Sequence, residues 1–187
     1  MTAPVAPAAG RTTYTIDASH STVEFAVKHM MITTVKGRLS ALQGTIELDE
    51  ADPASSTVVV EFDAASIDTR YEQPDAHLRS ADFLNCDAHP TMRFESRRLE
   101  NVGPVEGSSF RLTGDLTICG TTRAVTLDAV YEGRGRDPWG GERVSFSGET
   151  TIDRREFGLE WNQALETGGV LVSTNVKVQI DLQAVRN

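Results

Sequence analysis

The sequence contains four histidines, whose side chains can exchange protons near neutral pH: His20, His29, His77 and His89. A metal site needs three or four ligands that converge, but no two histidines have the i, i+4 spacing of a helix or the His-x-His spacing of a strand. The adjacent pair His20 and Ser21 combines a base with a nucleophile, yet neighbouring strand residues point to opposite faces. We therefore predict no metal centre, no cofactor and no catalytic pair.

Other chemical signatures are also absent from the sequence. It contains no GxSxG, HExxH or GxxxxGK[ST] motif and no GxGxxG that opens a helix. The glycine-rich stretch 133–141 lies between two periodic segments, so we interpret it as a hairpin loop rather than a phosphate site. Cys86 and Cys119 lack zinc-site spacing and are expected to be free thiols, with a disulfide between them left open.

The charge of the chain limits its partners. A formal net charge of -9 repels phosphate backbones, and no cluster of Lys and Arg reverses it locally, so we predict no nucleic-acid binding. The first ten residues lack the basic and apolar regions of a signal peptide, and we expect a cytoplasmic protein. The Ala- and Pro-rich residues 1–11 show no periodicity and are predicted to be a tail, followed by one domain over residues 12–187.

Alternation of apolar and polar residues with period two dominates the rest of the chain and predicts half-buried strands. Strands with a single apolar face favour antiparallel pairing, because parallel strands buried on both faces form continuous apolar runs. About eight such runs predict an all-β fold, either a sandwich or a barrel. The glycines that recur on the apolar faces favour a barrel, because glycine relieves crowding where strands bend or a ligand approaches: Gly37, Gly44, Gly114 and Gly148.

Three local features interrupt the alternation. Apolar parity switches between Val35 and Leu48, which predicts an inserted residue near Ala41. A short helix is predicted from Pro74 to Asp82, and a second helical turn over residues 153–158. His29 shares the parity of the apolar residues before it, so it points inward as a hydrogen-bonded core histidine or as a polar group at the mouth of a cavity.

Taken together, the segments resemble the YceI-like family of polyisoprenoid-binding proteins. The resemblance covers about residues 14–183 and rests on motifs in family order: Asp17-Ala-Ser-His20-Ser21-Thr-Val23-Glu-Phe25-Ala-Val27-Lys-His29, Gly37-x-Leu39, Gly44-x-Ile46, Asp75-Ala-His77-Leu78-Arg79-Ser80-Ala-Asp82-Phe83, Pro90-x-x-x-Phe94-x-Ser96, Gly114-x-Leu116-x-Ile118-x-Gly120 and Ile152-x-Arg154-x-x-Phe157-Gly158-Leu159. It implies an elongated, lipocalin-like antiparallel barrel of eight strands with one or two short helices, often a homodimer, that encloses an isoprenoid chain.

The inward parity then predicts a ligand site without formal charge, built from these side chains: Phe25, Val27, His29, Phe62, Phe94, Leu112, Leu116, Leu127, Phe146, Val176, Val178 and Ile180. The leading hypothesis is a non-enzymatic protein that carries or stores a polyisoprenoid or similar long apolar ligand, with transient membrane contact. The apolar residues 30–32 are interpreted either as an adaptable lid or as plain core filler. One alternative is an enzyme acting on such a lipid through His29, or through His77 with Asp75. Another is a barrel with a filled core that serves stress response or protein interaction.

Overall fold

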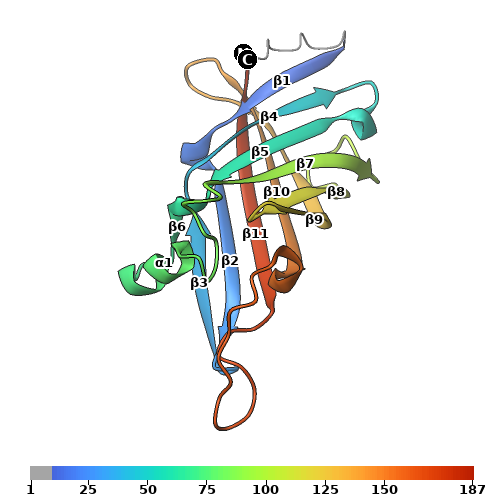
Figure 1. Cartoon of the computed structure of the whole chain (residues 1–187). Helices are drawn as coiled ribbons and strands as arrows, with labels where there is room; N and C mark the ends of the chain where they lie inside the picture. The colour runs from blue at the N-terminus through green and yellow to red at the C-terminus, as the bar shows by residue number, and fades with distance from the viewer. Residues whose placement is uncertain (1–9) are drawn as a thin grey trace.

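The predicted strands close into a barrel in the computed structural model, which describes residues 10–187 (Figure 1). Each strand of the ring pairs antiparallel with its neighbours, and pairing of the first strand with the last closes it. In spatial order the eight described strands of the ring are β1 (Arg11–Ile16), β4 (Leu42–Asp49), β5 (Thr57–Asp63), β7 (Thr91–Glu100), β8 (Ser109–Ile118), β9 (Thr121–Arg136), β10 (Glu142–Asp153) and β11 (Asn175–Arg186). The predicted antiparallel eight-stranded barrel is confirmed, and a sandwich is excluded.

Three further strands extend the wall of the barrel at one end: β2 (Thr22–His29), β3 (Thr33–Leu39) and β6 (Ile67–Asp68). They continue β1, β4 and β5 after short interruptions at η1 (Ala18–His20), at residues 40–41 and at η3 (Ala64–Ser66). β11 is long enough to pair with β1 near its end and with β2 nearer its start. The switch of parity predicted near Ala41 is the break between β3 and β4.

Two further 3-10 turns and one α-helix complete the described elements: η2 (Pro53–Ser55), η4 (Arg154–Phe157) and α1 (Glu72–Arg79). η4 lies within the predicted turn at residues 153–158. The helix predicted from Pro74 to Asp82 begins two residues earlier and ends at Arg79. It ends there because Ser80 is extended and its hydroxyl donates to the His77 carbonyl oxygen at 2.7 Å, a bond that competes with helix continuation.

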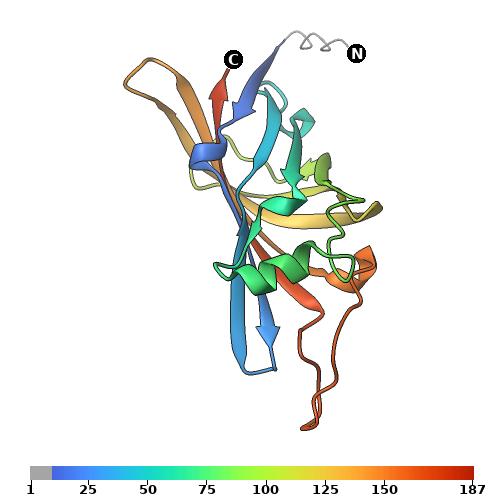
Figure 2. The same ribbon diagram turned by 60° about the vertical axis from the view of Figure 1, so that its left-hand side comes forward.

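The helix α1 lies against the barrel wall next to β6 (Figure 2), and polar contacts hold it there. Asp75 is buried, and its carboxylate accepts hydrogen bonds from the backbone N–H of Thr69 at 2.8 Å and from its hydroxyl at 2.6 Å. Arg79 donates to the carbonyl oxygens of Ala65 and Ile67, both at 2.9 Å. The helix therefore covers the part of the wall where β6 is too short to continue the sheet.

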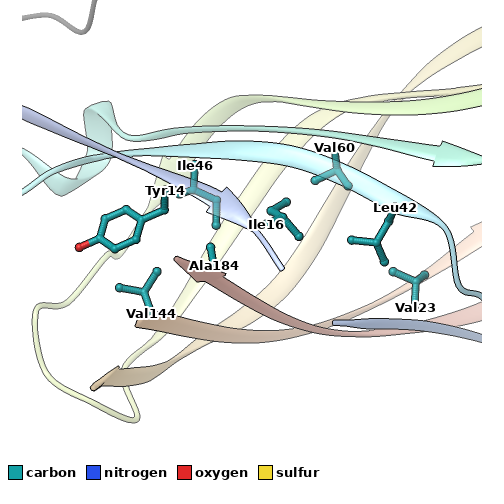
Figure 3. Close-up of a cluster of buried hydrophobic side chains, with 8 residues drawn as sticks. All are labelled: Tyr14, Ile16, Val23, Leu42, Ile46, Val60, Val144 and Ala184. Atoms are coloured by element: carbon teal, nitrogen blue, oxygen red, sulfur yellow. The ribbon is translucent and has the colours of Figure 1, made fainter. Parts of the chain in front are cut away.

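The upper end of the barrel is filled by packed side chains (Figure 3). Tyr14 is fully buried there, and its hydroxyl donates to Glu142 Oε1 at 2.5 Å. Burial together with this hydrogen bond raises the pKa of Tyr14 to about 12. The cluster closes this end of the barrel with eight buried residues: Tyr14, Ile16, Val23, Leu42, Ile46, Val60, Val144 and Ala184.

Two predicted boundaries need correction. Residues 1–9 of the predicted tail lie outside the described residues, but Arg11, its last residue, is the first residue of β1. Its guanidinium lies 3.5 Å from Glu47 and 3.6 Å from Asp49, on β4. The loop predicted at 133–141 is shorter, because β9 continues to Arg136 and pairs with β10 there.

Candidate ligand-binding cavity

Below the packed cluster the barrel is hollow. The cavity has a volume of about 870 Å³ and extends to the side covered by α1. This volume lies within the roughly 300–1,000 Å³ typical of sites that bury a small molecule. The barrel is therefore divided into a closed, packed end and an open, hollow end.

Aliphatic and aromatic side chains form most of the cavity wall. They come from β2, β3 and β5 through β11, because inward residues of successive strands meet around the lumen. Ten of the twelve residues predicted from parity lie on this wall: Phe25, Val27, His29, Phe62, Phe94, Leu116, Leu127, Val176, Val178 and Ile180.

Leu112 and Phe146, predicted as part of the site, do not line the cavity. Phe146 instead packs at the closed end, with ring centroids 6.2 Å from Phe110 and 5.5 Å from Tyr131. Leu112 shares the face of Leu116 but lies four residues, or about 13 Å, further along β8. The alternation of apolar and polar residues predicted correctly that both side chains face inward. It does not indicate how far along the barrel axis a residue lies.

Two of the recurring glycines make room for aromatic rings of the wall. A Cβ atom on Gly37 would lie 2.3 Å from the ring of Phe25, and one on Gly114 would lie 2.5 Å from the ring of Phe94. Both distances are far below ordinary contact, so no larger residue fits beside these rings as they stand. The expectation that these glycines relieve crowding on the inner face holds at both positions.

The mouth of the cavity combines aromatic rings with polar groups. His77 of α1 contacts two rings edge-on, with centroid distances of 5.0 Å to Phe83 and 4.6 Å to Trp161. Its Nε2 atom lies 2.9 Å from an oxygen of Asp82. The suggested partnership of His77 with Asp75 is wrong, because the Asp75 carboxylate is turned toward Thr69.

His29 lies at the rim where β2 ends. It is half-buried, lines the cavity, and its backbone bridges to Val172 of the segment before β11. Among the described residues its imidazole makes no hydrogen bond, whereas its carbonyl oxygen accepts one from the Thr33 hydroxyl at 3.3 Å. The structure therefore places His29 at the mouth of the cavity and not in a hydrogen-bonded core.

One fully charged side chain is buried at the same end. Arg154, in η4, is 4% exposed and lines the cavity. Its Nε donates to the carbonyl oxygen of Ser173 at 3.0 Å, and its guanidinium carbon lies 6.0 Å from the centre of the Phe83 ring. Burial lowers the pKa of Arg154.

The comparison with known proteins agrees with this architecture. The model of the YceI-like domain matches residues 14–184. The chain belongs to the YceI-like family. A UPF0312 protein of Pseudomonas paraeruginosa is 38% identical over 149 residues, which are 79% of this chain and 76% of that protein.

Solved structures share the YceI-like fold. The crystal structure of BcnA from Burkholderia cenocepacia has a TM-score of 0.76 at 22% identity and covers 90% of this chain and 99% of its own. A polyisoprenoid binding domain from Saccharophagus degradans, implicated in plant cell wall breakdown, has a TM-score of 0.68 at 15% identity and covers 94% and 99%. At these identities the likeness establishes the fold.

The remaining side chains with possible chemistry can be located in the described part of this YceI-like chain. No group of three or more metal-ligating side chains occurs among residues 10–187, and no helix there is long and apolar enough to span a membrane. His20 Nδ1 contacts Asp17 at 2.8 Å, whereas the Ser21 hydroxyl donates to the Gln183 carbonyl oxygen, so they do not form a nucleophile pair. Cys86 and Cys119 are free thiols, as predicted, and burial raises the pKa of both.

Several residues at the mouth of the cavity were not predicted from the sequence. Trp161, Leu171 and Val172 line the cavity but belong to the segment between η4 and β11, which has no strand periodicity to indicate a face. Arg154 did carry a signal. It continues the inward parity of Val144 through Ile152 and stands inside a family motif, so its direction was predictable even though its charge made it an unexpected wall residue.

Proposed function

We propose that this protein binds a long, apolar lipid of the isoprenoid type in the barrel cavity and carries or stores it. The observation that supports this proposal is the cavity of about 870 Å³ with a wall of aliphatic and aromatic side chains. A filled barrel would lack such a space. The description of the Saccharophagus degradans relative as a polyisoprenoid binding domain is consistent with the same class of ligand.

The free energy of transfer from water indicates that such a ligand comes from a membrane. Burying a chain of about forty carbons at about 0.8 kcal/mol per CH₂ corresponds to about 30 kcal/mol of transfer from water. This exceeds the roughly 18–21 kcal/mol at which non-covalent affinities saturate, so dissolved lipid is the wrong reference state. The interior of a bilayer is as apolar as the cavity wall. The free energy of moving the lipid from the bilayer into the barrel is therefore close to zero, as a carrier requires.

An exposed apolar tip next to the cavity mouth suits this exchange. Met30, Met31 and Ile32 join β2 to β3 and are 45%, 57% and 75% exposed. The Met30 backbone N–H donates to the carbonyl oxygen of Leu171 at 2.7 Å, and Leu171 lines the cavity. The β2–β3 hairpin and the segment that carries Leu171 both extend toward the bottom of Figure 1. We propose that this tip makes the transient membrane contact through which the ligand enters.

Two neighbouring residues of β11 provide a matched test. Val178 lines the cavity, whereas Gln179 is exposed on the outer face of the same strand. Each protein is incubated with vesicles that contain a polyprenol, separated from them, and extracted for lipid analysis. Val178→Trp fills the lumen and should reduce bound polyprenol at least about tenfold, whereas Gln179→Trp should load like the wild type. Thermal melting identifies folded variants.

A folded Val178→Trp protein that loads like the wild type would show that the lipid does not occupy the cavity. The enzymatic alternative is tested on the same material. If the bound lipid is recovered chemically altered, and the alteration disappears in His29→Ala or His77→Ala, then the protein is an enzyme. We expect the lipid to be recovered unchanged from the wild type and from both variants.

A further inference from the structure

The guanidinium of Arg154 is buried, and its hydrogen-bond acceptors in the described chain are uncharged carbonyl oxygens. It donates through Nε to the carbonyl oxygen of Ser173, through Nη2 to that of Val172 at 3.4 Å, and through Nη1 to that of Leu159. No carboxylate of the described chain lies within ion-pair distance of it. The nearest acidic residue in sequence, Asp153, instead binds Arg155, with an oxygen 2.6 Å from its Nη2. Arg154 is therefore buried without a carboxylate in ion-pair contact, and the charge of Asp153 acts on it from a longer distance.

Such a charge is costly unless a counter-charge is supplied. A buried ion is stabilised by pairing and hydrogen bonding, and leaving it unpaired is strongly unfavourable. An arginine has five N–H donors in a planar fork. The three bonds to carbonyl oxygens leave two N–H groups of Arg154, one on each Nη atom, for a further acceptor. A planar fork matches the two oxygens of a carboxylate or phosphate.

The composition of the cavity wall also favours an anionic group as the partner of Arg154. The whole chain has a formal net charge of -9, yet none of the described residues that line the cavity is Asp or Glu. The fully charged side chains on the wall are Arg154 and Lys36, both positive. In an acidic chain, the described wall of this apolar cavity thus lacks acidic groups and includes a buried cation.

Aromatic rings lie near this cation. The centre of the Phe83 ring is 6.0 Å from the Arg154 guanidinium carbon and 5.0 Å from the centre of the His77 ring. Its centre is also 5.3 Å from that of Trp161. A head group held here would have its chain directed along the apolar wall toward the closed end of the barrel.

We propose that Arg154 binds an anionic head group, a carboxylate or a phosphate, so that the cargo is an anionic single-chain lipid rather than a neutral one. This inference rests on the proposed function, since it assigns the head-group class of the same ligand. Both a prenyl phosphate and a fatty acid carry the required oxygens. The two sources are distinguished by experiment.

Head-group preference is measured first on the wild-type protein. Competitive binding compares geranylgeranyl phosphate with geranylgeraniol, and palmitate with hexadecanol, so that each pair shares one chain. We expect the anion to bind at least about tenfold more tightly than its alcohol in one pair or both. A preference in only one pair identifies the source as prenyl phosphate or fatty acid. Equal binding of anion and alcohol in both pairs would overturn this inference and leave the proposed function intact, whereas failure of all four to bind would contradict the proposed function itself.

Variants then assign the preference to a residue. Arg154→Gln should bring the ratio of anion affinity to alcohol affinity down to about one, and Arg154→Lys should retain part of the preference. Arg155→Gln is the control, because Arg155 is exposed and pairs with Asp153. If Arg154→Gln folds and still prefers the anion, Arg154 is not the site. Because Arg154 also holds loop carbonyls, a ³¹P spectrum of geranylgeranyl phosphate bound to the wild type provides a measurement independent of folding. The phosphorus signal should shift from its position in detergent, and an unshifted signal would contradict the contact.

Discussion

Gly114 is the position where one added methyl group should most directly disturb the wall of the cavity. A Cβ atom there would lie 2.5 Å from the ring of Phe94 and 2.5 Å from the backbone carbonyl oxygen of Glu95 on the paired strand β7. The ring can turn away into the lumen, but the carbonyl oxygen moves only with its strand. Overpacking of this kind costs about 1–3 kcal/mol. At about 2–4 °C per kcal/mol for a chain of this size, Gly114→Ala should lower the Tm by about 2–12 °C.

Gly148 provides the matched control on β10. The nearest atom to its added Cβ would be the carbonyl oxygen of Asp128 at 3.5 Å, which is ordinary contact. Removing a glycine without a clash stabilises a protein by about 0.4–1 kcal/mol, through lower entropy of the unfolded chain. Gly148→Ala should therefore melt at or slightly above the wild type.

Scanning calorimetry at neutral pH, on protein stripped of lipid, separates these effects from ligand binding. A Gly114→Ala variant as stable as the wild type would refute the reasoning, because the close approach of β7 and β8 would then not constrain the wall. An equal loss of stability in Gly148→Ala would refute it as well, since a general effect of losing glycine would then explain both results. Gly114→Ala should also load less polyprenol, because the Phe94 ring is displaced toward the lumen.

Three further predictions concern pH and exchange. Hydrogen bonds from Ser19, then from Arg143 and His20, hold the pKa of Asp17 well below its usual range. This stabilisation is present above the unfolded pKa of about 3.9 and is lost as the pH falls below it, so calorimetry from pH 6 to pH 2 should show a smaller fall in Tm for Asp17→Asn than for the wild type. Because the pKa of Tyr14 is raised to about 12, its contribution is present below the unfolded value of about 10 and is lost as the pH rises toward 12. Tyr14→Phe should accordingly lose less stability than the wild type between pH 9 and pH 11, and a parallel loss would contradict this assignment. Ile32→Lys should slow lipid transfer from vesicles severalfold without changing the final amount bound, and an unchanged transfer rate would exclude the tip as the membrane contact.

The fold was predictable from the sequence because its main determinant is local. In β11, for example, Val176, Val178 and Ile180 face inward because their alternation with polar residues has the period of a strand. That alternation did not show whether the strands form a barrel or a sandwich. It came from the glycines on the inner face and from the family resemblance, and the pairing of β1 with β11 decides it in the structure.

The candidate site was predictable in direction but not in depth. Phe146 and Leu112 face inward like their neighbours, yet they lie toward the closed end, and depth depends on register and strand tilt around the whole barrel. The residues at the mouth of the cavity were harder to predict from the sequence. Trp161 comes from a segment without periodicity, and its place beside His77 depends on how that segment folds back against α1.

Some predictions concern properties that the fold of one chain does not determine. Whether the protein is a homodimer depends on contacts with a second copy of the chain. Whether it is cytoplasmic depends on cellular sorting. Whether it lacks catalytic activity depends on which substrates are tested. These stay predictions. The apolar cavity and its buried arginine are features of the chain itself, so the proposals above depend on them.

The most direct test of the central claim is native mass spectrometry of the freshly purified protein, prepared without detergent and followed by lipid extraction. We expect a discrete excess mass that corresponds to one lipid with a long apolar chain, and its loss in Val178→Trp. A wild-type protein that shows only the mass of the bare chain, both as purified and after incubation with isoprenoid-containing vesicles, would contradict lipid binding in the barrel.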